Sequence, residues 1–512
     1  MQEIINTLNG LIWSPALIYL CLGAGLFFTV LTRFVQLRQF KEMIRLLLSG
    51  KSSQKGISSF QALAVSLSGR VGTGNIAGVA AAIGFGGPGA VFWMWIVAFF
   101  GAATAYIEST NAQIYKEEEN GVYRGGPAYY IEKAMGQKWY AWMFAISTIL
   151  ACGVLLPVVQ SNGIGDSLVN VFGNGGTVPS FIGKLALTKV YAATFIVLIL
   201  GFIIFGGVKR IANFTQIVVP FMALAYIIIA CVIISLHINL LPSIFMSIIT
   251  DAFTPMAGFG AAIGWGVKRG VYSNEAGQGT GPHAAAAAEV DHPAQQGLVQ
   301  SFSVYIDTLF VCSATAFMIL ITQSYNVLPE GSTAFIVQHL PDDVVISGPA
   351  FTQIAVDSVL SGFGKPFIAI ALFFFAFTTI LAYYFIAENN VSYINRTIKI
   401  PALRFVLKLI IMFAVFYGTV AQPSAAWTLG DIGVGLMAWL NIIGIIIIFF
   451  MAKPAIKALN DYERQQKDGV KNYTFDPVKL GIKNADFWER RFAKHQPKTH
   501  ETDLSQSKSE NH

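Results

Sequence analysis

The chain has 512 residues, of which 54% are hydrophobic and 12% are charged, and its formal net charge is +6. A soluble domain carries about 25% charged residues, so this composition excludes an ordinary soluble protein and indicates one that crosses a membrane many times. The four cysteines fall in apolar runs without CxxC spacing, which argues against a disulfide framework and against a zinc site.

Apolar stretches of the length that a bilayer requires, about 20 residues, predict an all-α polytopic membrane protein with about eleven spans. A shorter apolar stretch at 350–361 is expected to be a helix that does not cross. In chain order, the spans are expected near residues 11–31, 60–84, 89–114, 140–160, 190–208, 213–236, 243–268, 299–322, 366–388, 403–421 and 429–451.

Basic residues alternate between the two sides of these spans. They cluster after the first span and in every second connection, whereas the connection 323–364 contains neither Lys nor Arg. Because cytoplasmic loops carry the excess of Lys and Arg, we expect the N-terminus outside, the C-terminus in the cytoplasm, and a location in the cell membrane. The basic residues are Arg33, Arg38, Lys41, Arg45, Lys51, Lys55, Lys116, Arg124, Lys133, Lys138, Lys209, Arg210, Arg396, Lys399 and Arg404.

Closely spaced glycines interrupt the second and the seventh spans. Residues 72–78 of "SLSGRVGTGNIAG" read GxGxxxG, and residues 258–264 repeat that spacing. The two spans start on opposite sides of the membrane. Matched interruptions of this kind point to a transporter built from inverted repeats, each of five helices, with the first span as an addition. The predicted organisation is therefore an N-terminal helix and basic segment (1–58), a first repeat (59–236), a second repeat (237–452) and a polar cytoplasmic tail that is partly disordered (453–512).

An unwound helix in a membrane is tolerated where its free backbone groups line a polar cavity. Free amides suit a carboxylate and free carbonyls suit a cation, so a zwitterionic amino acid together with a small cation would use both. The alternative is that either glycine pattern is a helix-packing face. A dinucleotide fingerprint is excluded, because the third glycine comes one residue late and no βαβ unit surrounds it.

Three stretches carry a resemblance to a known family. "SLSGRVGTGNIAGVAAAIGFGGPGAVFWMW", "GVYRGGPAYYIEKAMG" and "KRGVYSNEAGQGTGPHAAAAAEVDHPAQQG" are similar to the alanine or glycine:cation symporters, also called sodium:alanine symporters. The resemblance extends from the first span to about Met451. It implies the leucine-transporter-like fold of the amino acid–polyamine–cation superfamily.

The resemblance also implies two groups of site residues. The substrate carboxylate is expected at the amides of Thr73 and Gly74, and Gln160 is expected to be a polar contact, although it could instead bridge helices. The second broken span is expected to place Phe259, Gly260, Ile263 and Trp265 around the ligand.

For the cation, the resemblance implies a site between the first broken helix and the ninth span. Carbonyls near Gly69 and Val71 would join the hydroxyls of Thr378 and Thr379, and this oxygen set suits Na⁺. The alternative for the two threonines is a hydrogen bond to carbonyls of their own helix.

Charged residues inside the spans need their own explanation. We expect Arg70 to pair with Glu275 or Asp307 and to act as a gate or brace, and Asp307 to be structural rather than a proton carrier. Glu108 is expected to reach the membrane interface. The cluster of His283, Glu289, Asp291 and His292 matches no established metal motif.

These observations predict a secondary active symporter that imports alanine or glycine on a sodium gradient, without a cofactor, nucleic acid or obligate protein partner. The nearest alternative is a proton-coupled symporter on the same fold. A channel fits the paired central interruptions less well. An enzyme is not expected, because the chain has no HExxH or nucleophile motif.

Overall fold

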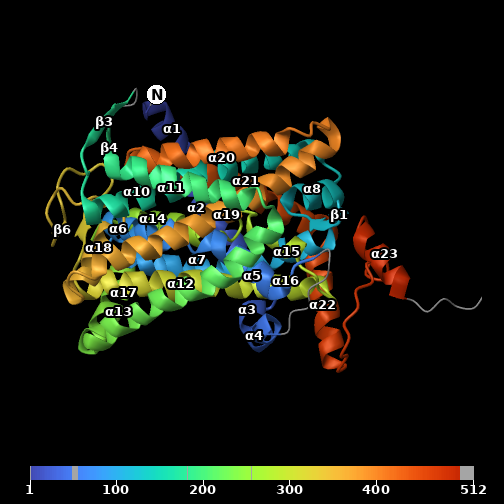
Figure 1. Cartoon of the computed structure of the whole chain (residues 1–512). Coiled ribbons are helices and arrows are strands. Elements are labelled where there is room, and N and C mark those ends of the chain that lie inside the picture. The colour runs from blue at the N-terminus through green and yellow to red at the C-terminus, as the bar shows by residue number, and fades with distance from the viewer. Residues whose placement is uncertain (1, 49–55, 181–182, 255, 347, 496–512) are drawn as a thin grey trace, which may run out of the picture.

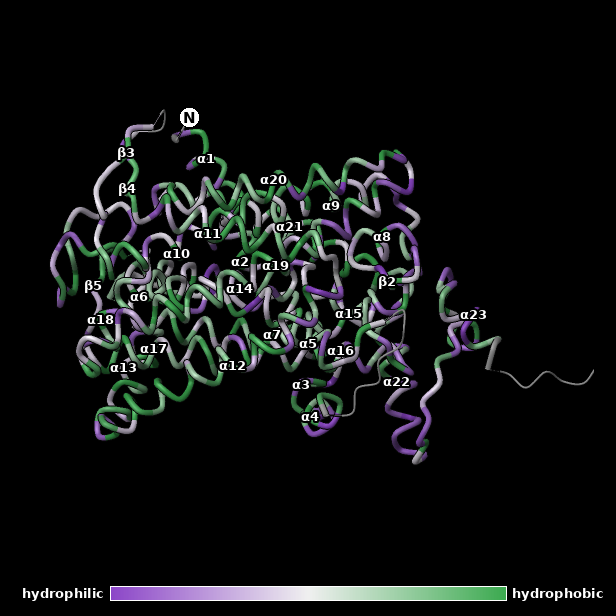
Figure 2. Tube along the Cα trace, in the orientation of Figure 1, coloured by the Kyte–Doolittle hydropathy of each residue, from purple (hydrophilic) through white to green (hydrophobic). Residues whose placement is uncertain are grey.

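The computed structural model describes residues 2–48, 56–180, 183–254, 256–346 and 348–495, so Lys51 and Lys55 lie outside the described residues. Within these ranges, nine helices are long and apolar enough to cross a membrane. Figure 2 shows hydrophobic residues concentrated along the long helices of the bundle and hydrophilic residues in the C-terminal segment. The expected all-α membrane class is confirmed.

The nine long helices coincide with nine of the eleven expected spans. Two of them contain a π-helical turn, η2 (Ala151–Leu155) or η4 (Tyr305–Cys312), in mid-course. In chain order they are α2 (Pro15–Leu31) preceded by α1 (Gln2–Ile12), α7 (Gly89–Ile114), α9 (Lys138–Leu150) with η2 and α10 (Leu156–Phe172), α11 (Leu187–Ile204), α12 (Val208–Leu236), α16 (Pro293–Val304) with η4 and α17 (Ser313–Ile321), α19 (Gly364–Ile398), α20 (Leu403–Val420) and α21 (Pro423–Ala452).

The other two expected spans are interrupted helices. The first consists of α5 (Ser59–Arg70), a break at 71–73, the π-helical turn η1 (Gly74–Gly78) and α6 (Val79–Gly86). The second consists of α14 (Phe259–Asn274), a break at 275–280 and α15 (Gly281–Ala287). Because α5 packs against α15 and α6 packs against α14, the two interrupted helices run antiparallel to each other.

The predicted position of the seventh span is wrong. Residues 243–268 belong to two separate helices, α13 (Leu241–Phe253), which follows the short turn η3 (Ile238–Leu240), and α14, which continues to Asn274. The glycines at 260 and 264 lie within uninterrupted helix rather than at a break. Further along α14, a Cβ on Gly266 or Gly270 would overlap α7 atoms at about 2.5 and 2.4 Å, so those glycines permit close helix packing.

The connections divide between two ends of the bundle (Figure 1). The basic end holds α3 (Val35–Arg38), α4 (Phe40–Leu48), the hairpin β1–β2 (Glu117–Glu119 and Val122–Arg124) and α8 (Pro127–Met135). The opposite end holds the hairpin β3–β4 (Thr177–Ser180 and Gly183–Ala186), the pair β5–β6 (Asn326–Val327 and Val337–Gln338) and α18 (Ala350–Val359). The expected short helix at 350–361 is thus present as α18.

The segment expected to be a partly disordered tail is folded over much of its length. It contains α22 (Pro454–Lys467), which packs against α7 and α16, and α23 (Asp486–His495). Both lie at the basic end, and the N-terminus lies toward the opposite end (Figure 1). Residues 496–512 lie outside the described part of the chain.

Candidate functional site

The backbone amides of the first break donate hydrogen bonds to side-chain oxygens, which hold the break open. The Gly72 amide donates to Asn75 Oδ1 at 2.8 Å, and the Thr73 amide donates to Gln160 Oε1 of α10 at 2.9 Å. Gln160 is 1% exposed. Gln160 was expected to contact the amino acid or to bridge helices. In the structure it bridges α10 to the first break, and its amide oxygen accepts from the Thr73 N–H that was expected to hold a ligand carboxylate.

The second break lies beside the first. It begins at Glu275, whose φ of 57° is left-handed, and contains Gly277 and Gly279 with φ of 86° and 83°. A Cβ on Gly74 would lie 3.1 Å from the Tyr272 ring and 3.4 Å from the Ser273 Cα, so the last turn of α14 contacts the first break directly. Tyr272 and Ser273, rather than residues near the start of α14, therefore face Thr73 and Gly74.

Four residues expected at the ligand are displaced by this correction. Ile263 precedes Asn274 by 11 residues, which is about 16 Å along the helix axis, and Gly260 is farther still. Trp265 stacks on Phe85 with ring centroids 4.6 Å apart, in the cavity described below. The side chain of Phe259 lies outside the described part of the chain.

Asp307 joins the two breaks. Its carboxylate accepts hydrogen bonds from Asn75 Nδ2 at 2.6 Å, Ser273 Oγ at 2.9 Å and Thr308 Oγ1 at 2.7 Å. Asn75 follows the first break and Ser273 precedes the second. These hydrogen bonds tie the two interrupted helices to η4 through one buried side chain.

Oxygen atoms converge between the first interrupted helix and α19. The Thr379 hydroxyl donates to the Ser68 carbonyl at 2.7 Å and lies 3.4 Å from that of Val71, and it also lies 2.9 Å from the Phe375 carbonyl of its own helix. Hard oxygen donors of this kind fit a small cation, and Ser68 replaces the expected Gly69 as the neighbour of Thr379. Gly69 lies instead against the Glu275 carboxylate, whose Oε2 would be 3.1 Å from a Cβ at that glycine.

The neighbouring Thr378 does not face these oxygens. Its hydroxyl donates to the carbonyls of Phe374 and Phe375 at 2.9 and 3.0 Å, within its own helix. Successive residues of an α-helix are about 100° apart around the axis, so Thr378 and Thr379 point in different directions. Of the two threonines expected as cation ligands, only Thr379 therefore faces carbonyls of another helix.

Arg70 braces a different element from the one predicted. Its Nη1 donates to the Gln300 carbonyl at 3.1 Å and contacts the Ser303 hydroxyl, both on α16, and among the described residues it forms no ion pair with Glu275 or Asp307. Glu108 is also placed differently from the prediction. It is fully buried and accepts hydrogen bonds from Asn441 Nδ2 and the Gly277 amide instead of reaching an interface.

A cavity of about 530 Å³ opens toward the opposite end of the bundle, above the two breaks. Its floor is a buried ion pair, Arg269 with Asp431, whose closest atoms are 2.6 Å apart. The Arg269 guanidinium lies 4.5 Å from the centre of the Trp427 ring, and Tyr272 lies beneath Trp427, with ring centroids 5.2 Å apart. This layer separates the cavity from the breaks. Asn6, Asn9, Phe85, Trp265, Lys268, Glu330 and Thr428 also line the cavity.

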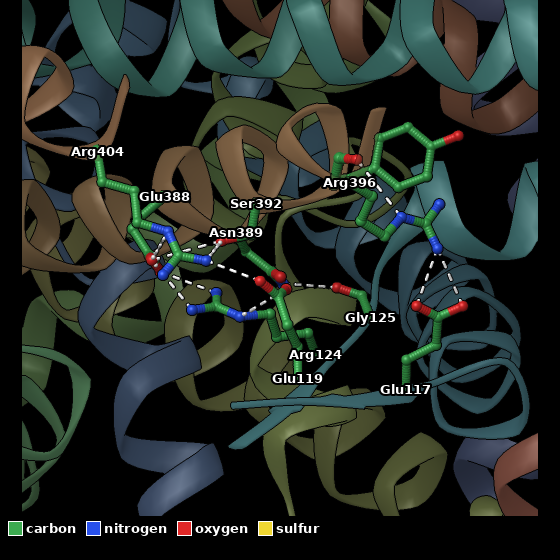
Figure 3. Close-up of polar contacts among 10 residues, drawn as sticks. Glu117, Glu119, Arg124, Gly125, Glu388, Asn389, Ser392, Arg396 and Arg404 are labelled. Atoms are coloured by element: carbon green, nitrogen blue, oxygen red, sulfur yellow. Dashed lines mark hydrogen bonds and ion pairs between the residues drawn. The ribbon is translucent and has the colours of Figure 1, made fainter. Parts of the chain in front are cut away.

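The basic end of α19 is fixed by a buried ionic network (Figure 3). Arg124 of the β1–β2 hairpin contacts both carboxylate oxygens of Glu388 at 2.9 and 3.0 Å, and Arg404 bridges Glu388 and Glu119. Asn389 donates to the Gly125 carbonyl at 2.7 Å. The helix that carries Thr379 is therefore anchored at the basic end.

Sequence reasoning missed several residues that the structure brings to this site. Ser68 precedes the predicted glycine pattern and Asn75 lies within it, and only the folded geometry gives them their contacts. Asp431 carried a usable signal, because a charged residue within an expected span, here 429–451, is a functional candidate by default. Arg269 directly follows the expected seventh span, 243–268, and so escaped that rule.

Comparison with known proteins shows which family the sequence matches. The model of the sodium:alanine symporter family matches residues 1–477. YrbD of Bacillus subtilis (strain 168), provisionally named as a sodium/proton-dependent alanine carrier protein, is 56% identical over 98% of this chain and 99% of its own. A sodium/proton-dependent alanine carrier protein of Bacillus sp. (strain PS3) is 50% identical over 89% of this chain and 99% of its own, and GlnT of Bacillus subtilis (strain 168), a probable sodium/glutamine symporter, is 40% identical over 93% of each chain.

The match to the family covers nearly the whole chain, and the relatives are transporters rather than enzymes. The family expected from the three sequence stretches is thereby confirmed. This chain belongs to the sodium:alanine symporter family.

Proposed function

We propose that this protein imports alanine, and glycine as an equally small substrate, together with Na⁺ down the sodium gradient. The observation that carries this proposal is the proximity of two kinds of binding group on one broken helix. The oxygens around Thr379 adjoin the break through Ser68 and Val71, and the amides of Thr73 and Gly74 follow within three residues.

In this mechanism the cation binds first and fixes the end of α5 against α19. The cation would be held by the carbonyls of Ser68 and Val71 and the Thr379 hydroxyl. This contact orders the break, because the same short segment continues into the amides that face the substrate. The amino acid carboxylate then binds at the Gly74 amide, since Gln160 already occupies the Thr73 amide.

Tyr272 and Gln160 are proposed to limit substrate size, in place of the residues first expected around the ligand in the second broken span. The Gln160 Nε2 lies 3.5 Å from the Tyr272 hydroxyl, so the two side chains meet beside Gly74. Little space remains there for a long side chain. GlnT, which is 40% identical, bears a name that refers to glutamine, so glutamine belongs in the competitor panel.

Transport then requires alternating access through the two halves of a leucine-transporter-like inverted repeat. We propose that the basic end faces the cytoplasm and that the N-terminus is outside. The layer of Arg269, Trp427 and Tyr272 closes the outer path, and the α5 and α15 halves close the inner one. Opening either closure alone would expose the breaks to one side.

The test is uptake of labelled alanine by proteoliposomes containing the purified full-length protein. We expect uptake above the equilibrium level with an inward sodium gradient, competition by unlabelled glycine, and weaker competition by glutamine. A choline gradient of equal strength is the control. Equal uptake in sodium and choline, with stimulation by an inward proton gradient, would contradict sodium coupling and favour the proton-coupled alternative.

A further inference from the structure

The inner halves of the two interrupted helices are joined to each other at the basic end. Ile57, just before α5, pairs with Ala288, just after α15, as an isolated parallel bridge. The Ile57 amide donates to the Ala287 carbonyl at 3.0 Å, and the Glu289 amide donates to the Ile57 carbonyl at 2.8 Å. We call these four residues, Ile57, Ala287, Ala288 and Glu289, the inner junction.

The inner junction is itself held by α7 and the β1–β2 hairpin. Lys116 Nζ, two residues beyond the end of α7, donates to the Ala288 carbonyl at 2.9 Å, and Gln113 Nε2 of α7 donates to the same oxygen at 3.0 Å. Tyr123 of the hairpin donates from its hydroxyl to Glu289 at 2.9 Å. Opening toward the basic end requires the junction to leave these contacts.

Helix α23 covers this arrangement with two aromatic side chains. Lys116 Nζ lies 4.6 Å from the centre of the Phe487 ring and 5.4 Å from that of Trp488. Trp488 is 2% exposed, and its indole N–H donates to the Gln113 carbonyl at 2.7 Å. Phe487 also packs edge-on against Tyr123, with ring centroids 5.1 Å apart.

Ionic contacts connect the same helix to the inner junction and to α8. Arg491 Nη1 lies 2.5 Å from Glu289 Oε1, on the connection that follows α15. Asp486 lies 2.9 Å from Lys133 Nζ on α8, the helix that leads into α9. Helix α23 therefore bridges the inner junction to elements that do not belong to either interrupted helix.

We propose that α23 is a latch that keeps the inner path closed and must loosen when the protein opens toward the basic end. The proposal rests on the alternating access described above. The latch lies beyond residue 477, where the match to the family model ends. Its release would set how readily the inner path opens, without any contact with the substrate.

The latch is tested by the accessibility of a cysteine placed between the inner halves. Ser66 on α5 suits this purpose, because it is 4% exposed, its hydroxyl faces Gly281 of α15, and Ser66→Cys preserves its shape. The variant is made in a chain whose four native cysteines are replaced. A membrane-impermeant thiol reagent is then applied from the basic-end side of reconstituted vesicles.

We expect Arg491→Ala and Trp488→Ala to accelerate labelling of the cysteine about five- to thirtyfold, because a change of 1–2 kcal/mol alters a population by that factor. Arg490→Ala is the matched control, since Arg490 is the exposed neighbour on the same helix and its removal changes the net charge equally. Arg490→Ala should label at the parent rate. Size-exclusion chromatography checks that each variant folds.

Equal labelling of Arg491→Ala and Arg490→Ala would overturn the latch. This readout does not depend on transport. Failure of alanine uptake by the unaltered protein would count against the proposed function, whereas unchanged labelling in a transporting protein would count against the latch alone.

Discussion

Replacing Thr379 by valine is expected to raise the sodium concentration for half-maximal alanine uptake at least about tenfold, because losing an interaction with a charged group costs about 1.5–3 kcal/mol. Valine keeps the shape of threonine but removes the one side-chain oxygen that faces the Ser68 and Val71 carbonyls. Uptake by proteoliposomes at a series of sodium concentrations gives the measurement.

Thr378→Val is the matched control for this variant. It makes the same chemical change one residue earlier, where the hydroxyl bonds to carbonyls of its own helix. We expect its sodium dependence to stay within about twofold of the unaltered protein, because the lost bonds are local and partly replaced in the helix. Equal shifts in the two variants would show that neither hydroxyl binds the cation.

Replacing Gly72 by alanine is expected to reduce alanine uptake at least about tenfold, because overpacking a closed site costs about 1–3 kcal/mol. The added Cβ would lie 2.5 Å from Thr379 Oγ1 and 2.8 Å from Gln160 Oε1. Both atoms are held in place, Thr379 by the Ser68 carbonyl and Gln160 by the Thr73 amide. One methyl group would thus disturb the cation and the substrate sides of the break together.

Gly78→Ala provides the comparison, since its Cβ would meet Trp427 and Arg269 at 3.7 and 3.8 Å, which is ordinary van der Waals contact. We expect Gly78→Ala to transport at close to the unaltered rate and to unfold at an equal or higher temperature, because alanine favours helix over glycine. Uptake and thermal unfolding are measured for both variants. A Gly72→Ala protein that matches Gly78→Ala in uptake would contradict the geometry assigned to the break.

The first break could be predicted because its sequence contains both signals that matter. Closely spaced glycines permit unwinding, and an arginine in the same stretch excludes a lipid-facing surface. The second break could not be located in the same way. The glycines at 258, 260 and 264 share the spacing of 72–78, but Gly258 only precedes the start of α14, and Gly260 and Gly264 lie in uninterrupted helix. The actual break begins at a non-glycine residue, Glu275, in left-handed conformation. Spacing alone does not distinguish a packing face from a hinge.

At the proposed cation site, residue type alone does not predict which side chains make contact. From the sequence, Thr378 and Thr379 of the ninth span were equally suitable as cation ligands. Adjacent residues of a helix point in different directions, so only Thr379 faces Ser68. Arg70 illustrates the same limit, since its donors reach a carbonyl and a hydroxyl of α16 rather than either expected carboxylate. Which neighbour a buried charge finds depends on packing between helices far apart in the chain.

The C-terminal segment was misjudged for a different reason. Its polar composition is typical of a solvated tail, and the residues that fix α23 in place, Phe487 and Trp488, are few and close together. Their docking surface is built from Lys116 and Tyr123, more than 350 residues earlier in the chain. A local pattern cannot reveal such a surface.

The central claim is that sodium and the amino acid share one broken helix, and calorimetric titration of the purified full-length protein with alanine tests it most directly. We predict that the alanine Kd falls as sodium replaces choline, and that alanine tightens sodium binding by the same factor, as linkage requires. Thr379→Val should reduce that factor, while Thr378→Val should preserve it. An alanine Kd that is the same in sodium and in choline would contradict the account.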